Sequence, residues 1–294
     1  MTRWVVTGAG GMLGRDLLAA LENAGEQAAG LARRELDITD GAAVRAALRR
    51  HRPDVVVNCA AWTRVDEAEA YESEALAVNG HGAANLVGAC GGTGARLVHI
   101  STDYVFAGDA ARPYAEHDAT GPRTAYGRTK LAGEQAVLRQ LPADGYVLRT
   151  AWLYGAHGPN FVRTMVRCER ERPAVDVVDD QHGQPTWTAD VANAVIALVR
   201  SGAPAGVYHA TSSGSVTWYG FAREIFGLLG ADPARVRPVT TAEFPRPAPR
   251  PAYSVLGHGA WAAAGLGPLP GWQESLRHAL PGLLAAEAAA TAAG

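Results

Sequence analysis

The sequence predicts an α/β fold built on a doubly wound parallel sheet, followed by a smaller α/β region. Short apolar runs alternate with longer helical patterns through the first half of the 294 residues. These runs are continuously apolar, which is typical of strands covered on both faces. A glycine-rich turn joins the first run to the first helical pattern. Strands and helices that alternate at this spacing are the pattern of a parallel sheet built from βαβ units.

The elements follow one another in a regular order. The strands expected in the first half are Trp4–Val6, Gln27–Ala32, Asp54–Asn58, Arg96–Ile100 and Tyr146–Arg149. The helices expected there are Leu13–Asn23, Ala42–Arg50, Ser73–Cys90 and Tyr126–Arg139. After about Gly155 strands become sparse, and the expected helices are Asn160–Arg170, Asp190–Arg200 and Trp218–Leu229. The alanine-rich segment 285–294 predicts a frayed helix or a disordered tail.

Composition and charge narrow the class of protein. Hydrophobic residues make up 48% and charged residues 19%, which favours a compact globular fold over disorder. A formal charge of −2 gives no electrostatic case for a nucleic-acid partner. The cysteines Cys59, Cys90 and Cys168 form no CxxC pair, which argues against a disulfide framework or a zinc site. With no signal-like segment and no membrane-length apolar run, we expect a cytoplasmic protein without a membrane partner.

A dinucleotide-binding loop is predicted between the first strand and the first helix. Its glycines are Gly8, Gly11 and Gly14, with Gly10 as a fourth. The chain must turn sharply there, approach a pyrophosphate closely and hold the helix against the sheet, and a Cβ would obstruct each. The helix N-terminus at Met12 and Leu13 offers free N–H groups and a positive dipole end. A glycine-rich turn without a ligand is the alternative, which this position disfavours.

The end of the second strand indicates which dinucleotide to expect. NAD sites usually carry an acidic residue there, which binds the ribose 2′-hydroxyl. Here Arg33 and Arg34 come first, and Glu35 and Asp37 follow. A guanidinium suits a 2′-phosphate because it donates charge-assisted hydrogen bonds. We expect NADP(H), with NAD(H) as the alternative if the two arginines are only solvated surface.

A candidate catalytic pair stands at Tyr126 and Lys130. Side chains four residues apart on a helix share a face. An ammonium near a phenol favours the phenolate, so we expect Lys130 to lower the pKa of Tyr126 toward neutrality. Upstream, Ser101 and Thr102 follow a buried strand, where hydroxyls point into the ligand crevice of parallel sheets. His99, inside that strand, is interpreted as a buried core histidine rather than a catalyst.

The glycine loop, the strand-end Ser-Thr pair and the Tyr-x-x-x-Lys pair together are the arrangement of the short-chain dehydrogenase/reductases. Within that superfamily the chain resembles the dTDP-4-dehydrorhamnose reductase family. The resemblance spans nearly the whole chain, in order. The segments that carry it are residues 7–14, 58–69, STDYVFAG at 101–108, YGRTK at 126–130, RTAWLYG at 149–155, 160–161, GQPT at 183–186 and RPAYS at 250–254.

The resemblance implies a division of the chain and a reaction. Residues 1–154 would be an NADP-binding Rossmann domain. Residues 155–294 would mainly bind the sugar nucleotide, with segments of about 187–207 and 245–257 returning to the Rossmann domain. The implied reaction is hydride transfer from the nicotinamide to C4 of a dTDP-4-keto-6-deoxyhexose.

Site residues follow by matching position. Thr102 would hydrogen-bond the substrate oxygen, Tyr126 would donate the proton, and Lys130 would hold the nicotinamide ribose. Besides Arg33, already expected at the 2′-phosphate, the resemblance places along the cofactor Asp37, Ile38, Asn58, Ala60 and Ala61. It places in the sugar-nucleotide site Val65, Asp103, Tyr104, Trp152, Asn160 and Gln184.

Departures from the family pattern leave the sugar open. Trp62 stands where the family often has histidine or a small polar residue, and Ala107 replaces the usual acid before Gly108. Ketoreductases of antibiotic pathways, including those making deoxysugars or streptose-like branched sugars, therefore remain alternatives. Some family members dimerise through glutamates that hold magnesium. Arg15 and Asp16 stand near the first expected ligand, so we expect no metal, and either a monomer or a homodimer.

Two other functions stay open. A nucleotide-sugar 4,6-dehydratase or epimerase would recycle bound NAD. A dehydratase generally carries Asp-Glu after the threonine, whereas here Tyr104 follows Asp103. The resemblance also extends to a regulatory subunit of methionine adenosyltransferase, which binds NADP without catalysis. The intact Tyr126 and Lys130 disfavour that role.

Overall fold

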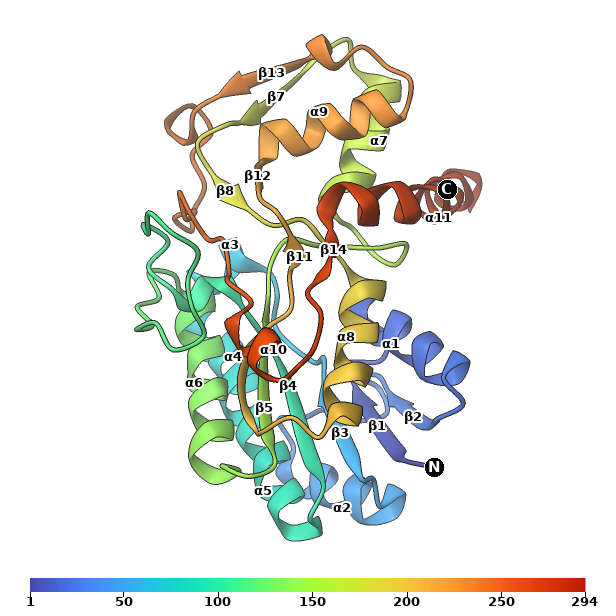
Figure 1. The fold of residues 1–294 in the computed structure, drawn as a ribbon, viewed down its shortest axis with the longest axis vertical. Helices are drawn as coiled ribbons and strands as arrows, with labels where there is room; N and C mark the ends of the chain where they lie inside the picture. Colours follow the sequence, from blue (N-terminus) through green and yellow to red (C-terminus); the bar gives the residue numbers. More distant parts are fainter. Residues whose placement is uncertain (294) are drawn as a thin grey trace.

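A six-stranded parallel sheet forms the centre of the larger lobe (Figure 1). The computed structural model describes residues 1–293, with side chains to residue 290. The strand order is β10-β5-β4-β3-β1-β2, and every pairing is parallel. The strands are β1 (Arg3–Thr7), β2 (Gln27–Leu31), β3 (Val55–Asn58), β4 (Arg96–Thr102), β5 (Gly145–Thr150) and β10 (Gly206–His209). The predicted fold class is confirmed.

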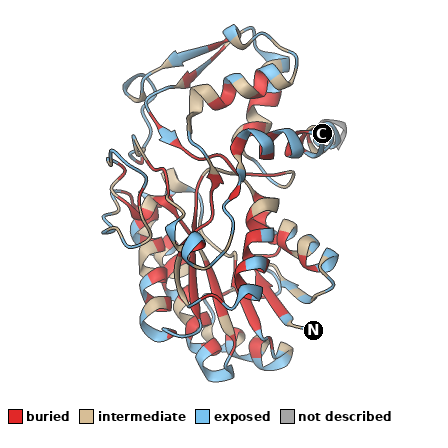
Figure 2. Cartoon of the chain, viewed as in Figure 1, coloured by how far each residue is buried: buried red, intermediate tan, exposed pale blue. Residues whose placement is uncertain are grey.

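Helices cover both faces of this sheet because successive side chains of its strands point to opposite sides. Val6 packs with α1 (Met12–Asn23) and α8 (Thr188–Ser201) in one apolar cluster. Val5 packs with α2 (Gly41–His51), α5 (Ala83–Thr93) and α6 (Ala125–Gln140) in another. Burial is concentrated along the strands and the inner helix faces (Figure 2).

The segment expected as one helix over Ser73–Cys90 is interrupted. It consists of α4 (Glu72–Leu76), a π-helical turn η1 (Ala77–Gly82) and α5. A π turn accommodates an extra residue and is frequent at functional sites. Close contacts accompany it, since a Cβ on Gly82 would lie 2.7 Å from Cγ1 of Ile38. The turn brings Asn79 into the interior, where it is 1% exposed.

The smaller lobe has its own core around Tyr154, Phe221, Phe226 and Leu276. Its helices are α7 (Phe161–Glu171), α9 (Trp218–Leu228) and α11 (Trp272–Ala293). Its short strands are β6 (Leu153–Tyr154), β7 (Val175–Val178), β8 (His182–Gly183), β9 (Thr186–Trp187), β11 (Ser212–Ser213), β12 (Val216–Thr217), β13 (Val236–Val239) and β14 (Leu269–Gly271). The remaining short helices are α3 (Val65–Ala68) and α10 (Gly259–Ala263), with 3-10 turns at Asp103–Val105, Pro233–Arg235 and Thr241–Glu243.

Two later segments run back along the larger lobe. Helix α8 packs on α1, and β10 lies beside β5 as an edge strand of the main sheet. Further on, backbone hydrogen bonds join Tyr114 to Val255 and Gly257, and His182 to Ala252. The loop between β4 and α6 is therefore held by the segment around residue 255. Among the described residues, no helix is both long and apolar enough to cross a bilayer.

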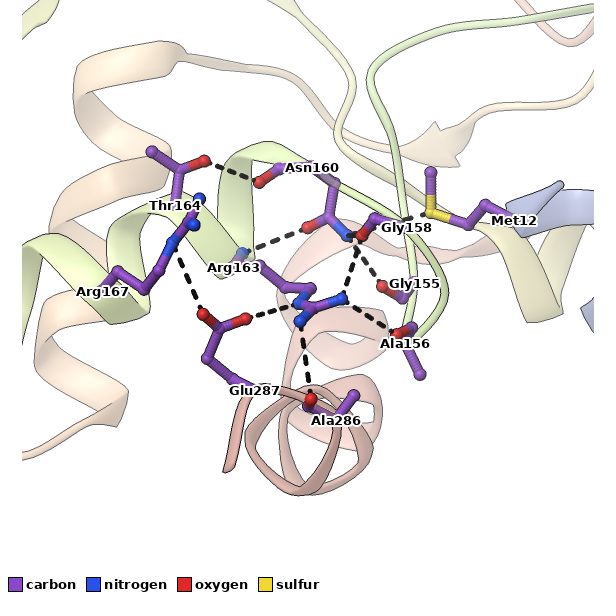
Figure 3. A network of polar contacts seen from close by, with 10 residues as sticks. All are labelled: Met12, Gly155, Ala156, Gly158, Asn160, Arg163, Thr164, Arg167, Ala286 and Glu287. Carbon is purple, nitrogen blue, oxygen red and sulfur yellow. Dashed lines mark hydrogen bonds and ion pairs between the residues drawn. The ribbon is translucent and has the colours of Figure 1, made fainter. Parts of the chain in front are cut away.

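The alanine-rich segment is helical as far as Ala293, as part of α11. Glu287, 4% exposed, accepts a hydrogen bond of 2.6 Å from Nε of Arg163 on α7 and lies 3.4 Å from Arg167. Arg163 also donates to the carbonyls of the 156–158 loop (Figure 3). These contacts with α7 hold the alanine-rich end of α11 in place, and its composition alone does not predict them.

Candidate active site

The predicted glycine loop turns from β1 into α1. Gly8 has a φ of +66°, and a Cβ there would lie 2.5 Å from the backbone nitrogen of Ala60. A Cβ on Gly14 would lie 2.5 Å from the carbonyl oxygen of Gly8, so only glycine allows α1 to sit this close. Gly11 is the N-cap without a side-chain hydrogen bond, and the first turn carries no acidic residue. The N–H groups of that turn therefore suit a pyrophosphate.

The residues expected at the adenine end lie after β2. Arg33 and Arg34 have side chains 86% and 88% exposed. Arg33 stands 3.6 Å from Asp37, whereas Arg34 pairs directly with Glu35. Both guanidiniums reach solvent, and only that of Arg33 is loosely held. Ile38 is buried and its carbonyl accepts a hydrogen bond of 2.9 Å from Asn85.

A set of buried, hydrogen-bonded polar groups lies at the carboxyl ends of β1 and β3. Asn58 is 1% exposed, and its Oδ1 accepts hydrogen bonds from Thr7 Oγ1 at 2.7 Å and from the Ala60 N–H at 3.1 Å. Its Nδ2 lies 3.0 Å from Nδ1 of His99 on β4. Asn58, Ala60 and Ala61 thus run past Gly8, on the side of the loop where the sequence places a cofactor.

Tyr126 lies in an apolar cluster at the carboxyl end of the sheet. The cluster joins α6 to α3 and α4, and its partly buried members are Trp62, Val65 and Tyr104. The Tyr104 ring meets that of Tyr126 edge-on, with centroids 5.7 Å apart and planes at 74°. The structure therefore brings together Tyr126 with the predicted sugar-site residues Val65 and Tyr104.

The pKa of Tyr126 is raised, because burial disfavours the phenolate and the Asp103 charge adds to this. A hydrogen bond with Thr102 acts in the opposite direction. The expectation that Lys130 lowers this pKa is not met, because the pKa is raised and Lys130 is not among the groups that shift it. The consequence is that Tyr126 keeps its proton at neutral pH, which is the form needed for proton donation.

Lys130 is 2% exposed on the same face of α6. Its Nζ donates to the Ile100 carbonyl at 2.6 Å and lies 3.4 Å from Nε2 of His99. Burial lowers the pKa of Lys130 to about 8, and the charge of Glu134 opposes this. An ammonium so sparsely bonded has donors left for a ligand.

Thr102 ends β4 and Asp103 begins the 3-10 turn after it, next to Tyr126. The Thr102 hydroxyl donates to Oδ1 of Asp103 at 2.9 Å and accepts from the Tyr104 N–H at 3.2 Å. Asp103 is 3% exposed, and burial raises its pKa to about 6. Hydrogen bonds with Ser254 and Thr102 oppose this rise and are outweighed by burial. The carboxyl group is thus a buried acid next to the candidate donor.

Trp152 follows β5 in a strained backbone conformation, with a φ of +46°. Its indole stacks on that of Trp218, the first residue of α9. Gly183 passes so close that a Cβ there would lie 2.4 Å from Cε2 of Trp152. The smaller lobe thereby fixes a predicted sugar-site side chain that belongs to the end of β5.

Two predicted sugar-site residues have other tasks in the structure. Asn160 caps α7, accepting from the Arg163 N–H at 3.1 Å and donating to the Gly155 carbonyl at 2.8 Å (Figure 3). The amide of Gln184 is saturated by four hydrogen bonds. Its partners are Thr211 Oγ1, the Leu256 N–H and the carbonyls of Ser212 and Leu256. An amide offers two acceptor and two donor positions, so Gln184 has none left for a ligand.

Asn79 was missed by sequence reasoning. Its side chain accepts from the Trp62 N–H at 2.8 Å, and donates to the Trp62 carbonyl at 3.1 Å and to Thr129 Oγ1 at 3.0 Å. It therefore fastens the Trp62 segment to α6, next to Tyr126. The signal was absent because the helical pattern does not reveal a π turn. No set of three or more His, Cys, Asp or Glu side chains within the described part of the chain could hold a metal ion.

Comparisons with known proteins show the family. A family model described as RmlD substrate binding domain matches residues 2–284. The dTDP-4-dehydrorhamnose reductase of Streptomyces griseus is 58% identical over 285 residues, covering 96% of this chain and 94% of that protein. The dTDP-4-keto-6-deoxy-D-glucose reductase of Streptomyces niveus is 59% identical over 285 residues, covering 97% and 99%.

Solved structures of dTDP-4-dehydrorhamnose reductases are also similar to this chain. A crystal structure of dTDP-4-dehydrorhamnose reductase from Bacillus anthracis, in complex with NADP, has a TM-score of 0.92 at 38% identity, covering 95% of this chain and 98% of that one. The orthologue from Clostridium acetobutylicum has a TM-score of 0.92 at 41% identity, covering 96% and 99%. The chain therefore belongs to the dTDP-4-dehydrorhamnose reductase family of NADP-dependent oxidoreductases.

Proposed function

We propose that the protein reduces the C4 ketone of a dTDP-4-keto-6-deoxyhexose with NADPH. The observation that carries this is the position of Tyr126, buried beside Val65 and Tyr104, with Lys130 one helical turn away. Relatives at 58% and 59% identity named for ketosugar reductases support it. These relatives are named for different sugars, so the assay compares several hexoses.

Each residue has a task in this proposal. When bound, NADPH supplies a hydride to C4, becoming NADP⁺. The Tyr126 hydroxyl gives its proton to the carbonyl oxygen, so that the ketone becomes a secondary alcohol. Thr102, at the end of β4 and bonded to Tyr126, would donate to the same oxygen once its hydroxyl proton turns away from Asp103. Lys130 holds the nicotinamide ribose through its free N–H groups.

The cofactor and the sugar would lie on opposite sides of the group formed by Thr102, Tyr126 and Lys130. We propose that the first turn of α1 binds the pyrophosphate, that Arg33 binds the ribose 2′-phosphate, and that Asp37 and Ile38 flank the adenine. We further propose that residues 1–154 supply most of the cofactor site. Residues 155–294 would supply most of the sugar-nucleotide site, to which Trp152 adds a stacking face.

The test is consumption of NADPH on addition of a panel of dTDP-4-keto-6-deoxy sugars, with analysis of product stereochemistry. Tyr126→Phe should lower kcat by about 100-fold or more, because it removes the proton donor, while the Kd for NADPH stays within about twofold. Turnover of the Phe variant close to wild type would overturn the assignment.

The same assay separates the alternatives. Conversion of a dTDP-sugar by purified protein without added NADPH, using tightly held NAD, would indicate a dehydratase or epimerase. Failure to turn over any ketosugar, together with recovery of a stoichiometric protein partner, would indicate a regulatory subunit. Either result would replace the reductase proposal.

A further inference from the structure

A line of buried polar contacts connects the cofactor side of the sheet to Lys130. It runs from the Ala60 N–H through Asn58 and His99 to Nζ of Lys130, and the three side chains are 1%, 0% and 2% exposed. Nothing in the proposed mechanism uses His99. Because the contacts of Asn58 with Ala60 and with His99 must match donor to acceptor, the protonation of the ring can be deduced.

The deduction starts from a backbone donor. The Ala60 N–H can only donate, so the amide atom of Asn58 that faces it is Oδ1, which the Thr7 hydroxyl also contacts. The other amide atom, Nδ2, therefore faces Nδ1 of His99 and donates to it at 3.0 Å. A neutral imidazole that accepts at Nδ1 carries its proton on Nε2. The pKa of His99 is far below its usual value, owing to burial and then to Lys130, so the ring is neutral.

The Nε2 proton points toward a group that also donates. Nζ of Lys130 lies 3.4 Å from Nε2, against 2.6 Å from the Ile100 carbonyl. The longer distance is that of two donors facing each other, whereas the shorter is a charge-assisted hydrogen bond. Gly133 of α6 packs against the ring, since a Cβ there would lie 3.0 Å from Nε2. The imidazole therefore has little room to turn away.

We propose that His99 is a positioning residue for Lys130. Hydrogen bonds through Asn58 fix the ring as the Nε2–H tautomer, which denies the lysine a second acceptor on β4 beside the Ile100 carbonyl. The ammonium then bonds strongly only to Ile100 and keeps its other N–H groups for a ligand in the cleft. This inference rests on the proposed role of Lys130 in holding the ribose.

The other ionisable groups around Lys130 come from neighbouring elements. Glu134 on α6 and Cys59 after β3 both raise the pKa of Lys130, against the larger effect of burial. Glu134 is itself paired with Arg149 on β5, at 2.8 and 3.0 Å. None of these groups lies between Nε2 and Nζ, so a change confined to His99 tests the contact.

The first experiment measures the tautomer directly. In protein labelled with ¹⁵N-histidine, the His99 signals are those lost in His99→Gln. We expect the proton on Nε2, an unprotonated Nδ1 and a neutral ring between about pH 5 and 8. A proton on Nδ1, or a charged ring, would overturn the proposal. In Asn58→Asp the carboxylate only accepts, so Nδ1 should become protonated; an Nδ1 that stays unprotonated would equally contradict the chain of bonds.

The second experiment uses an unusual feature of the sequence, which contains no lysine other than Lys130. Labelled lysine thus gives one side-chain signal, whose titration midpoint is the pKa of Lys130. His99→Gln offers the ammonium a carbonyl oxygen, and His99→Leu offers nothing. We expect the Gln midpoint to exceed both the wild-type and Leu midpoints, by roughly half a unit or more. His258→Gln, which changes a half-buried histidine bonded to Thr211, should leave the midpoint unchanged.

Equal Lys130 titration midpoints in His99→Gln and His99→Leu would overturn the proposal. Water entering the space left by the imidazole would then explain any shift, and the Gln carbonyl oxygen would have no effect of its own. The titration requires no substrate, so its outcome is separate from that of the reductase assay. As a functional readout, the alkaline limb of the kcat/KM profile should move to higher pH in His99→Gln by as much as the Lys130 titration midpoint does. An alkaline limb that does not follow the Lys130 midpoint would overturn the link to catalysis.

Discussion

The indole of Trp152 lies face to face on that of Trp218, with ring centroids 3.6 Å apart and planes tilted by only 7°. Trp152 belongs to the loop after β5, and Trp218 begins α9 of the smaller lobe. The stack joins the two lobes at a residue predicted to contact the sugar. It also supports a backbone whose φ is +46°, a region that tryptophan rarely adopts.

Removing this support should weaken sugar binding. Trp218→Ala is expected to raise KM for the ketosugar about threefold to tenfold, because an aromatic pair contributes about 0.5–1.5 kcal/mol. The Kd for NADPH should not change. Trp218→Phe keeps a ring face and should recover most of the loss. Steady-state kinetics with fluorescence binding of NADPH provides the check, and an unaltered KM in the Ala variant would contradict the prediction.

Arg33 should decide the preference between the two dinucleotides. Arg33→Ala is expected to raise the Kd for NADPH about tenfold or more, since a hydrogen bond to a charged group contributes about 1.5–3 kcal/mol. Binding of NADH, which has no 2′-phosphate, should be unaffected. Arg34→Ala is the matched control, because Arg34 pairs with Glu35. Calorimetric titration with both dinucleotides measures this. Equal losses for NADPH and NADH would show that Arg33 does not read the phosphate.

Asp103 should make stability depend on pH. Its pKa is raised by burial from 3.8 to about 6 in the folded protein. Between these values the folded protein keeps a proton that the unfolded chain releases, so stability falls as pH rises through this window and levels off above it. The total amounts to roughly 3 kcal/mol.

Asp103→Asn should remove that decline. Urea denaturation at intervals from pH 4 to pH 8 would compare the variant with wild type and with Asp109→Asn, whose side chain is exposed. The difference between Asp103→Asn and wild type should grow between about pH 4 and 6 and then remain constant. Parallel curves throughout would argue against a carboxyl group whose pKa is raised by burial.

Two ion pairs on α6 have the same geometry and opposite burial. Arg149 binds Glu134 through two hydrogen bonds with side chains 4% and 1% exposed. Arg128 binds Glu72 equally well, with side chains 45% and 43% exposed. Glu134→Gln should lower the free energy of unfolding by about 3–5 kcal/mol, because Arg149 keeps an uncompensated buried charge. Glu72→Gln should cost less than about 1 kcal/mol. Similar losses in chemical denaturation would contradict this.

The sequence predicts the elements whose signals are local. The continuous apolar strands, the glycine corner and the Tyr126–Lys130 spacing each follow from rules that act over a few residues. All of them appear in the structure within a few positions of the predicted bounds. Tyr126 and Val65 meet because both lie at the carboxyl end of the same parallel sheet, which the fold class already requires.

What escaped prediction depends on contacts between distant segments. The π turn places Asn79 where its side chain bonds Trp62 and Thr129. These partners are distant in the sequence, so the helical periodicity around Asn79 does not predict them. Gln184 looks available in the sequence, yet its four hydrogen bonds go to residues 211, 212 and 256. The predicted lowering of the Tyr126 pKa is wrong, because the spacing of Tyr126 and Lys130 reveals a neighbouring charge but not how deeply the phenol is buried.

The place of β10 in the main sheet has a consequence for biosynthesis. Strand β5 pairs with β4 on one side and with β10 on the other. While the ribosome is still making the residues before 206, β5 therefore presents a row of unpaired amide and carbonyl groups. The nascent chain is exposed to mispairing with other chains during that interval, and a fragment cut at residue 154 would remain so permanently.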